Sequence, residues 1–166
     1  MLLGELVKAV GLRGEVKLHP SADFWDEALA SRQLQLSTAS GRRAVSVEAA
    51  RRHGARMRVL RLGGVEDRGA AEDLVGAHLV LPLEALDVPL PPAPRPFQVR
   101  GLRVLLPDGT LLGRVEEVLP MPAQDVFVVR GGGREYLIPD APAIVREVDL
   151  ESGLMRVEPP PGLLEL

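Results

Sequence analysis

Alternating apolar and polar residues, interrupted by turns that contain glycine, run through the second half of the chain between Leu102 and Glu158. Such alternation is typical of antiparallel strands that are buried on one face. Glycine suits the turns because hairpin turns often require positive φ angles. The strands predicted from this pattern are 102–106, 111–118, 125–130, 134–139, 144–150 and 154–158. We therefore predict a meander of antiparallel hairpins that forms a small barrel or sandwich.

The first half shows the same alternation with two interruptions that suit short helices. One helix is expected over 23–29 after a cap at Ser21, and another over 67–75 before Gly76. The predicted strands are 2–10, 15–19, 33–37, 43–52, 56–62 and 78–81. We expect these strands to form a first β-barrel of about six strands.

A proline-rich segment separates the two halves. Residues 87–96 contain five prolines, which cannot donate to a β-ladder and which favour extended polyproline geometry. We therefore expect an N-terminal β-barrel over 1–86, a linker over 87–96 and a C-terminal barrel with a tail over 97–166. The predicted fold class is mainly β: two small antiparallel β-barrels joined by a proline-rich linker, with a few short helices.

Composition narrows the possible function classes. The chain has no cysteine, which excludes a disulfide framework, a cysteine zinc site and a thiol nucleophile. It contains no apolar run of about twenty residues that could span a membrane, so we expect a cytoplasmic protein. The net charge is −3, with 12 basic and 12 acidic side chains in residues 1–94 and with 8 basic and 11 acidic side chains in residues 95–166. The excess of acid therefore lies in the second half.

Residues that could carry catalysis or bind a metal are scattered. The three histidines, His19, His53 and His78, are far apart in the sequence and lack partners at the spacing of a metal site. Gly131–Gly133 precedes a predicted strand and so lacks the helix N-terminus that a phosphate-binding loop uses. We expect no catalytic residue, no metal and no cofactor. An enzyme that uses a cleft between the two barrels is the remaining catalytic alternative.

The strongest functional pattern is basic. Seven arginines but only one acid, Glu48, lie between residues 42 and 61, on two predicted strands joined at Gly54. We expect Arg51 and Arg52 to face across to arginines of the second strand, forming a stripe that suits phosphate. Like charges this close together cost stability unless something neutralises them. The alternative is a solvated strand edge on which arginines block aggregation.

A further candidate, Arg13, lies at the tip of the loop Gly11–Gly14, where glycines allow close approach to a ligand. A plain hairpin tip is the alternative at this position. No aromatic residues accompany the arginines for base stacking, so we expect contacts to phosphate and recognition of RNA shape. The candidate RNA-binding residues are Arg13, Arg42, Arg43, Arg51, Arg52, Arg56, Arg58 and Arg61.

Several short motifs occur in the order found in one protein family. Leu112-Gly113-Arg114-Val115, Asp125-Val126 and Leu137-Ile138-Pro139 resemble motifs of a PRC-barrel domain. Gly11-Leu12-Arg13-Gly14-Glu15-Val16 and the terminal Pro161-Gly162-Leu163-Leu164-Glu165-Leu166 resemble the RimM ribosome maturation factors, a family that carries this barrel. The order of the motifs along the chain, more than any single motif, makes the resemblance specific.

The resemblance implies a non-enzymatic, monomeric assembly factor that binds the immature small ribosomal subunit near its head. The implied partners are 16S rRNA and a head ribosomal protein, number nineteen of the small subunit, and the implied process is late assembly with 16S rRNA processing. The alternative function is a two-barrel protein–protein adaptor of another complex, without RNA contact.

The family usually carries adjacent tyrosines for docking on the small subunit, and the corresponding segment here contains Phe97 instead. The loop 119–124 exposes Met121 between two prolines. The candidates for binding a ribosomal protein are therefore Phe97, Met121 and Pro122. A core position in the first strand of the second barrel is the alternative for Phe97, and loop packing is the alternative for Met121.

Overall fold

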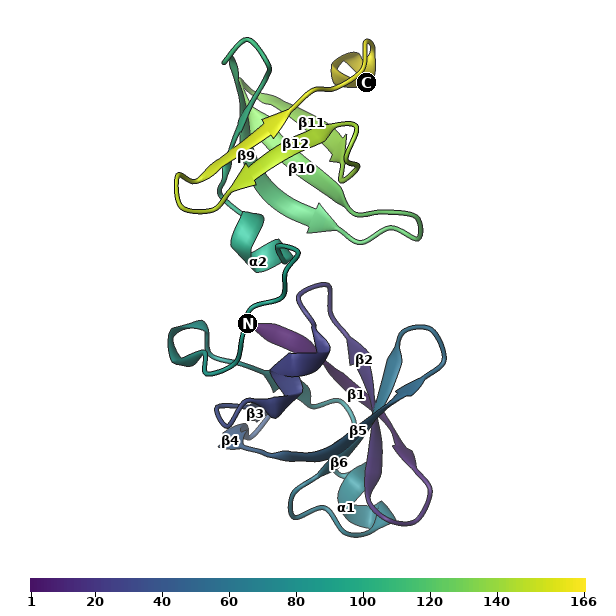
Figure 1. Ribbon diagram of the computed structural model, residues 1–166. Coiled ribbons are helices and arrows are strands. Elements are labelled where there is room, and N and C mark those ends of the chain that lie inside the picture. Colours follow the sequence, from purple (N-terminus) through teal and green to yellow (C-terminus); the bar gives the residue numbers. More distant parts are fainter. The chain divides into compact units, whose positions relative to one another are not determined.

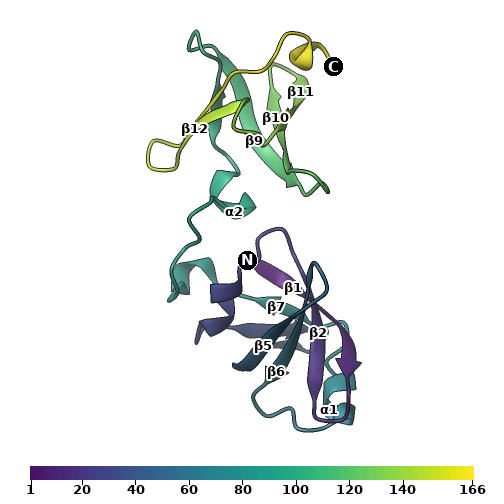
Figure 2. The same cartoon turned by 45° about the vertical axis from the view of Figure 1, so that its right-hand side comes forward.

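The computed structural model describes residues 1–166 and divides them into two compact units, Met1–Ala93 and Pro94–Leu166. The division falls inside the proline-rich segment 87–96. Each unit is built on one β-sheet with a few short helices, as Figure 1 and Figure 2 show, and this confirms the predicted mainly β fold class. None of the helices combines the length and the hydrophobicity needed to cross a membrane.

The first unit is a seven-stranded antiparallel sheet. Its strands are β1 (Leu2–Val10), β2 (Glu15–Pro20), β3 (Gln35–Thr38), β4 (Gly41–Ala44), β5 (Val47–His53), β6 (Met57–Leu62) and β7 (His78–Val80). They are hydrogen-bonded in the order β4-β3-β7-β1-β2-β6-β5. The helical turns between them are η1 (Asp26–Ala30), α1 (Arg68–Glu72) and η2 (Leu83–Ala85).

The outermost strands of this sheet, β4 and β5, are neighbours in the sequence, with only Val45 and Ser46 between them. Two residues can span only about 10 Å, so the sheet must curl until its two edges approach each other. Backbone bonds fix the crossing: Val45 N donates to Leu34 O (3.0 Å) and Gly63 N donates to Ser46 O (2.9 Å). The chain thus passes from one sheet edge to the other, which gives the unit its barrel-like form.

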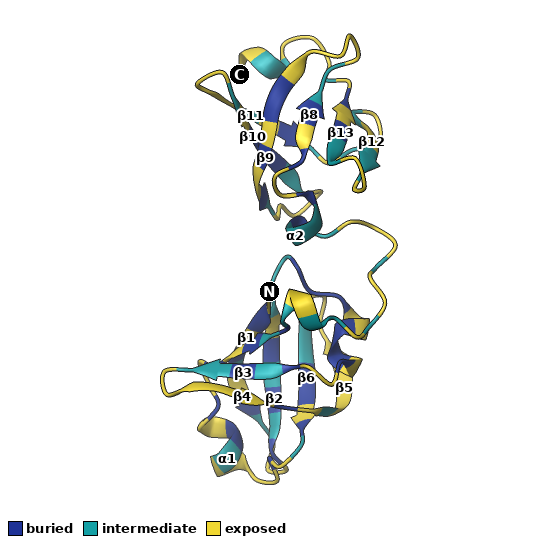
Figure 3. Ribbon diagram, turned by 90° about the vertical axis from the view of Figure 1, so that its left-hand side faces the viewer, coloured by how far each residue is buried: buried dark blue, intermediate teal, exposed yellow.

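The core of the first unit lies inside this curled sheet. Strand residues that point inward are almost entirely aliphatic, whereas β4 and most of β5 are exposed, as Figure 3 shows. The fully buried leucines of this core are Leu3, Leu6, Leu18, Leu34, Leu36, Leu60, Leu62, Leu79 and Leu81. Several of these leucines alternate with polar residues along their strands, which is why the sequence pattern predicts the strands.

Three elements of the first unit differ from their prediction. The helix expected over 23–29 is the 3-10 helix η1, which begins at Asp26, because the Ser21 hydroxyl donates to Leu2 O (2.6 Å) and does not cap a helix. The strand expected over 43–52 is broken at the edge crossing into β4 and β5, so the sheet has seven strands. The helix expected over 67–75 is shorter, since α1 ends at Glu72.

Asp67 caps α1, since its Oδ1 accepts a hydrogen bond from Ala70 N at 2.8 Å. We predict that Asp67→Ala lowers the free energy of unfolding of the first unit by about 1 kcal/mol, because the cap satisfies a helix N–H that is otherwise unpaired. Urea unfolding followed by the fluorescence of Trp25, the one tryptophan of the chain, measures this change. Asp73→Ala at the other end of α1 is the control, and an equal loss there would contradict a capping role.

The second unit is a six-stranded sheet in the order β11-β10-β9-β8-β13-β12. Its strands are β8 (Arg103–Leu105), β9 (Leu111–Leu119), β10 (Val126–Gly131), β11 (Arg134–Pro139), β12 (Val145–Asp149) and β13 (Leu154–Val157), and its short helices are α2 (Pro96–Val99) and η3 (Leu163–Glu165). The pairing is antiparallel except between β13 and β8, which are parallel. The prediction of an entirely antiparallel meander is wrong at this pair, because the chain crosses from β11 to the opposite edge, β12, before β13 returns beside β8.

Two glycines allow β9 and β10 to approach closely. A Cβ atom on Gly113 would lie 2.4 Å from Arg130 O, and one on Gly131 would lie 2.2 Å from Leu112 O. Both distances are shorter than van der Waals contact, so these positions require glycine. This contact explains the glycine of the Leu112–Val115 motif in physical terms.

The core of the second unit is closed at one end by the C-terminal tail. Leu163 and Leu164 of η3 pack against the same cluster as Tyr136 of β11, so the apolar tail folds back on its own unit. The buried residues of the cluster are Val99, Leu102, Val104, Leu112, Val115, Val118, Phe127, Val129, Ile138, Met155 and Val157.

The beginning of the proline-rich segment is held on the first unit. The Asp87 carboxylate accepts hydrogen bonds from the Ser31 hydroxyl and from Arg32 N, the latter at 3.1 Å. Trp25 Nε1 donates to Pro89 O at 3.1 Å. These bonds tie residues 87–89 to the two residues that flank η1, Trp25 and Ser31, and to Arg32. The helix α2 begins at Pro96.

Candidate nucleic-acid and protein interfaces

The arginine-rich hairpin consists of β5, β6 and the turn between them, and it carries five of the eight candidate RNA-binding residues. Arg52 pairs with Arg58 across the hairpin, whereas Arg51 pairs with Val59 and Arg56 lies in the turn. Successive strand residues point to opposite faces, so Arg51 and Arg52 cannot belong to one stripe. The prediction that both face arginines of β6 is therefore wrong for Arg51.

One carboxylate from outside the hairpin, Asp26 of η1, holds two of these arginines. Arg58 Nε lies 2.6 Å from Asp26 Oδ1 and Arg58 Nη2 lies 3.0 Å from Oδ2, a bidentate pair, and Arg52 Nη2 lies 3.4 Å from Oδ2. The Arg58 guanidinium also lies 5.4 Å from the centre of the Phe24 ring. We call Phe24, Asp26, Arg52 and Arg58 the Asp26 cluster. It fastens η1 to the hairpin.

The Asp26 cluster changes the proton affinities of its members. The hydrogen bond from Arg58 and the nearby positive charges hold the pKa of Asp26 below its ordinary value of 3.8, although partial burial opposes this shift. The hydrogen bond to Asp26 in turn raises the pKa of Arg58. Both groups are thus charged at neutral pH. The Arg58 side chain is only 11% exposed, so its charge stabilises the fold and is not accessible to a phosphate.

The lowered pKa of Asp26 predicts how stability depends on pH. A carboxyl whose pKa is lower in the folded state stabilises the fold above its unfolded pKa, and this contribution disappears as the pH falls through the folded value. We predict that Asp26→Asn costs the first unit about 1 kcal/mol at neutral pH, since the carboxylate is 45% exposed and solvent weakens the pair. The difference from wild type should shrink below about pH 4. Trp25-monitored urea unfolding at both pH values tests this, with Glu27→Gln as control; equal stability of Asp26→Asn and wild type at neutral pH would contradict it.

Two more hairpin arginines are paired with acids of the first unit. Arg51 Nη2 lies 3.0 Å from Glu15 Oε2 of β2, and Arg61 Nε lies 3.2 Å from Glu48 Oε2 of β5. Of the three acids that neutralise the hairpin, only Glu48 lies within the sequence window 42–61. The fold brings Asp26 and Glu15 to the hairpin from outside this window, so a count of charges along the sequence does not find them.

Four candidate residues remain exposed and form no ion pair: Arg13, Arg42, Arg43 and Arg56. We call them the unpaired arginines. Arg42 and Arg43 lie on the edge strand β4, Arg56 in the turn of the hairpin, and Arg13 at the tip between β1 and β2. They are the arginines of this set that form no ion pair with a carboxylate of the chain.

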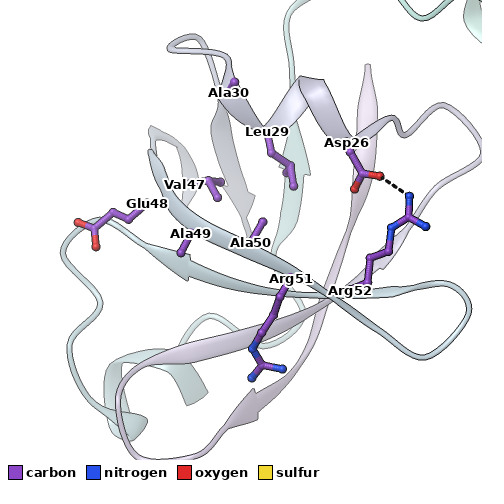
Figure 4. A pocket seen from close by; sticks show the side chains of 9 residues that line it. All are labelled: Asp26, Leu29, Ala30, Val47, Glu48, Ala49, Ala50, Arg51 and Arg52. Atoms are coloured by element: carbon purple, nitrogen blue, oxygen red, sulfur yellow. Dashed lines mark hydrogen bonds and ion pairs between the residues drawn. The ribbon is translucent and has the colours of Figure 1, made fainter.

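Open hollows lie beside several of the candidate arginines, both paired and unpaired. One hollow, between η1 and β5, has a volume of about 450 Å³. Figure 4 shows its lining along β5, with Glu48 at one end, Ala49 and Ala50 in the middle, and Arg51 and Arg52 at the other end. Arg52 reaches across this hollow to Asp26. A second hollow brings Arg13 beside Arg61 and Glu48, two residues that are distant from it in the sequence. These hollows are lined by both charge signs.

Two of the three histidines, His19 and His78, lie closer in space than in the sequence. Glu5 of β1 pairs with His19 of β2 on one side and with His78 of β7 on the other. Glu5, His19 and His78 therefore form one row across exposed positions of the sheet. Sequence spacing missed this row because each residue comes from a different strand. No three His, Cys, Asp or Glu side chains of the chain are arranged to hold a metal ion.

The candidates for protein binding occupy two places in the second unit. Phe97 lies half-buried in α2, so the alternative of a core position in the first strand is wrong, because that strand begins only at Arg103. Met121 and Pro122 lie in the exposed loop between β9 and β10, with Met121 52% exposed. Loop packing therefore does not bury Met121.

The two barrel-like units define the class of a two-domain β-protein, and the first unit carries an arginine-rich hairpin. Residues 1–86 match the family model of the RimM N-terminal domain, and residues 96–163 match that of the RimM PRC barrel domain. This chain belongs to the RimM family of ribosome maturation factors.

Two relatives that are more than 30% identical agree with this assignment. The chain is 37% identical to the ribosome maturation factor RimM of Symbiobacterium thermophilum, with 98% of this chain and 93% of the relative covered. It is 36% identical to the RimM of Acidothermus cellulolyticus, with 99% and 93% covered. A crystal structure of the RimM protein from Pseudomonas aeruginosa is 31% identical to this chain, with 96% of this chain and 97% of that chain covered and a TM-score of 0.48.

Proposed function

We propose that this chain binds the immature small ribosomal subunit near its head and assists late assembly and 16S rRNA processing. The first unit would contact 16S rRNA, and the second would contact a head ribosomal protein, number nineteen of the small subunit. The protein would act in the cytoplasm as a monomer, by binding and not by catalysis. The observation that carries the RNA contact is the set of unpaired arginines on a sheet whose other hairpin arginines are neutralised within the fold.

The unpaired arginines suit the phosphate backbone of RNA. A guanidinium presents donors in a planar fork that matches two phosphate oxygens, and each phosphate contact releases condensed counterions. Arg42 and Arg43 project to opposite sides of an edge strand, which allows the strand to lie between two backbone segments. Arg51 and Arg61 are about half exposed, but each is already paired with a carboxylate. They would contact RNA only if a phosphate replaced that carboxylate.

The second unit suits a basic protein partner. Its side chains carry 8 positive and 11 negative charges over residues 95–166, and complementary charge guides association and orientation. The exposed loop that carries Met121 and Pro122 adds a flexible apolar contact. The unpaired arginines of the first unit and the net negative charge of the second unit together support a bridge between RNA and protein.

A protein–protein adaptor without RNA contact is the second candidate. It is favoured by one observation: Arg51, Arg52, Arg58 and Arg61 are all paired with carboxylates of the chain. The two functions differ in salt dependence, because phosphate binding weakens steeply with salt.

Processing of 16S rRNA in a bacterium that lacks its own RimM gene tests the proposal. Expression of this chain should reduce the accumulation of precursor 16S rRNA and of free small subunits. A variant with glutamate at all four unpaired arginines, expressed to the same level, should not. Full accumulation of precursor with the wild-type chain present would contradict the proposed function.

A further inference from the structure

The outer face of the β10–β11 hairpin, which is turned away from the core, is apolar at one end and charged at the other, where Arg130 pairs with Glu135. Val126 pairs with Pro139 and Val128 pairs with Leu137. Because alternate strand residues share a face, these four side chains lie together, opposite the core residues of the same strands. The exposed face of an antiparallel sheet is ordinarily polar. An apolar patch here indicates a contact surface.

The C-terminal tail and the edge strand β11 enclose a hollow that extends from this face to Tyr136, which packs on the core side of β11. Figure 2 shows the tail beside β11, and the two elements enclose about 370 Å³ lined by Val126, Glu135, Tyr136, Leu137, Pro139, Leu163, Leu164 and Leu166. Arg134 holds the tail in place, because it donates to Leu164 O (3.4 Å) and lies 5.5 Å from the Tyr136 ring centre. Leu137 is 51% and Leu166 100% exposed. We call this the β11 hollow.

Carboxylates without cationic partners flank the β11 hollow. Asp125 and Asp140 adjoin its residues Val126 and Pro139, and Asp140 N donates to Asp125 O at 2.8 Å. Burial and the charge of Asp125 raise the pKa of Asp140, as expected for negative charge that nothing nearby offsets. Glu165 adds negative charge on the tail side. These carboxylates outnumber Arg134, the one cation that contacts the tail here, so the surroundings of the hollow favour a positively charged partner over phosphate.

We propose that the β11 hollow receives one bulky apolar side chain of a lysine- and arginine-rich protein segment, whose cations meet the flanking carboxylates. The inference rests on the proposed function, in which the partner is a basic ribosomal protein, and it gives that contact a place separate from Phe97 and Met121. The apolar floor supplies the burial, and the carboxylates select the charge of the partner. The tail, which forms one wall, becomes part of the binding site.

A peptide titration tests the hollow without the ribosome. The probe is the blocked peptide Lys-Lys-Phe-Lys-Lys, added to the isotope-labelled full chain and followed by NMR. Amide shifts should concentrate in residues 134–139 and 163–166. The peptides Glu-Glu-Phe-Glu-Glu and Lys-Lys-Ser-Lys-Lys should not produce them, and Leu137→Glu should abolish them. Equal shifts with the serine peptide, or shifts elsewhere only, would overturn the proposal.

A second measurement tests whether the β11 hollow contributes to binding of the immature small subunit. Leu137→Glu should weaken binding to immature small subunits about tenfold, as expected for an anchor position. Leu111→Glu, at a leucine of similar exposure (56% against 51%) outside the hollow, should leave binding unchanged. If Leu137→Glu binds immature subunits with wild-type affinity, the inference is overturned. It is also overturned if Leu137→Glu loses as much affinity for naked 16S rRNA as for the subunits, because the hollow would then be a nucleic-acid surface. Failure of the wild-type chain to bind subunits would instead contradict the proposed function, while the peptide titration still decides on the hollow.

Discussion

Replacement of all four unpaired arginines, Arg13, Arg42, Arg43 and Arg56, by glutamate is expected to weaken binding to the immature small subunit about a hundredfold. Each reversal removes a phosphate contact and introduces repulsion. Because about 0.7 counterions are released for each neutralised phosphate of a single strand, the slope of log affinity against log salt should become shallower by about 3. Binding measured at several salt concentrations gives both quantities.

The matched control for this variant replaces the same four residues by lysine. The charge is then kept, whereas the planar fork of donors is lost, so the salt slope should stay as in wild type and the affinity should fall far less. None of the four residues forms an ion pair or lies in the core, so both variants should fold. If the glutamate variant binds with wild-type affinity and salt slope, the chain contacts no RNA through these residues, and the adaptor function is favoured.

Arg58→Glu is expected to destabilise the first unit by about 2–4 kcal/mol. The new carboxylate would be largely buried, would face Asp26 and would lose both hydrogen bonds of the bidentate pair. Urea unfolding monitored by Trp25 reports this directly, because Trp25 adjoins Asp26 and is itself buried.

Arg56→Glu, two residues away in the exposed turn, is the control and should change stability by no more than about 0.5 kcal/mol. Similar losses in the two variants would contradict a structural role for the Asp26 cluster. The pair of variants also matters for function. Any loss of ribosome binding in Arg58→Glu would reflect the fold of the hairpin, so Arg58 is a poor position at which to test RNA contact.

The strands could be predicted from the sequence where local pattern decides them. Alternation and glycine turns located β2, β6, β9 and the hairpin β10–β11 to within a few residues. The break between β4 and β5 could not be predicted, because it depends on the closure of the whole sheet and not on the residues at 45–46. The parallel pair β8–β13 depends in the same way on the path of the chain between distant edges.

The candidate site could be predicted only as a concentration of charge. Local sequence shows where arginines gather but not which carboxylates the fold brings to them: Asp26 is 32 positions from Arg58, and Glu15 is 36 from Arg51. The separation into paired and unpaired arginines is therefore a tertiary property. The same holds for the β11 hollow, since the apolar run 126–129 does not reveal that alternate members face outward.

Sedimentation of the purified chain with immature small subunits, isolated from a strain without RimM, tests the central claim most directly. The account predicts that the chain travels with these subunits at low salt, is released as salt rises, and associates less with mature small subunits. A chain that stays at the top of the gradient at low salt, in the presence of the immature subunits, would contradict it.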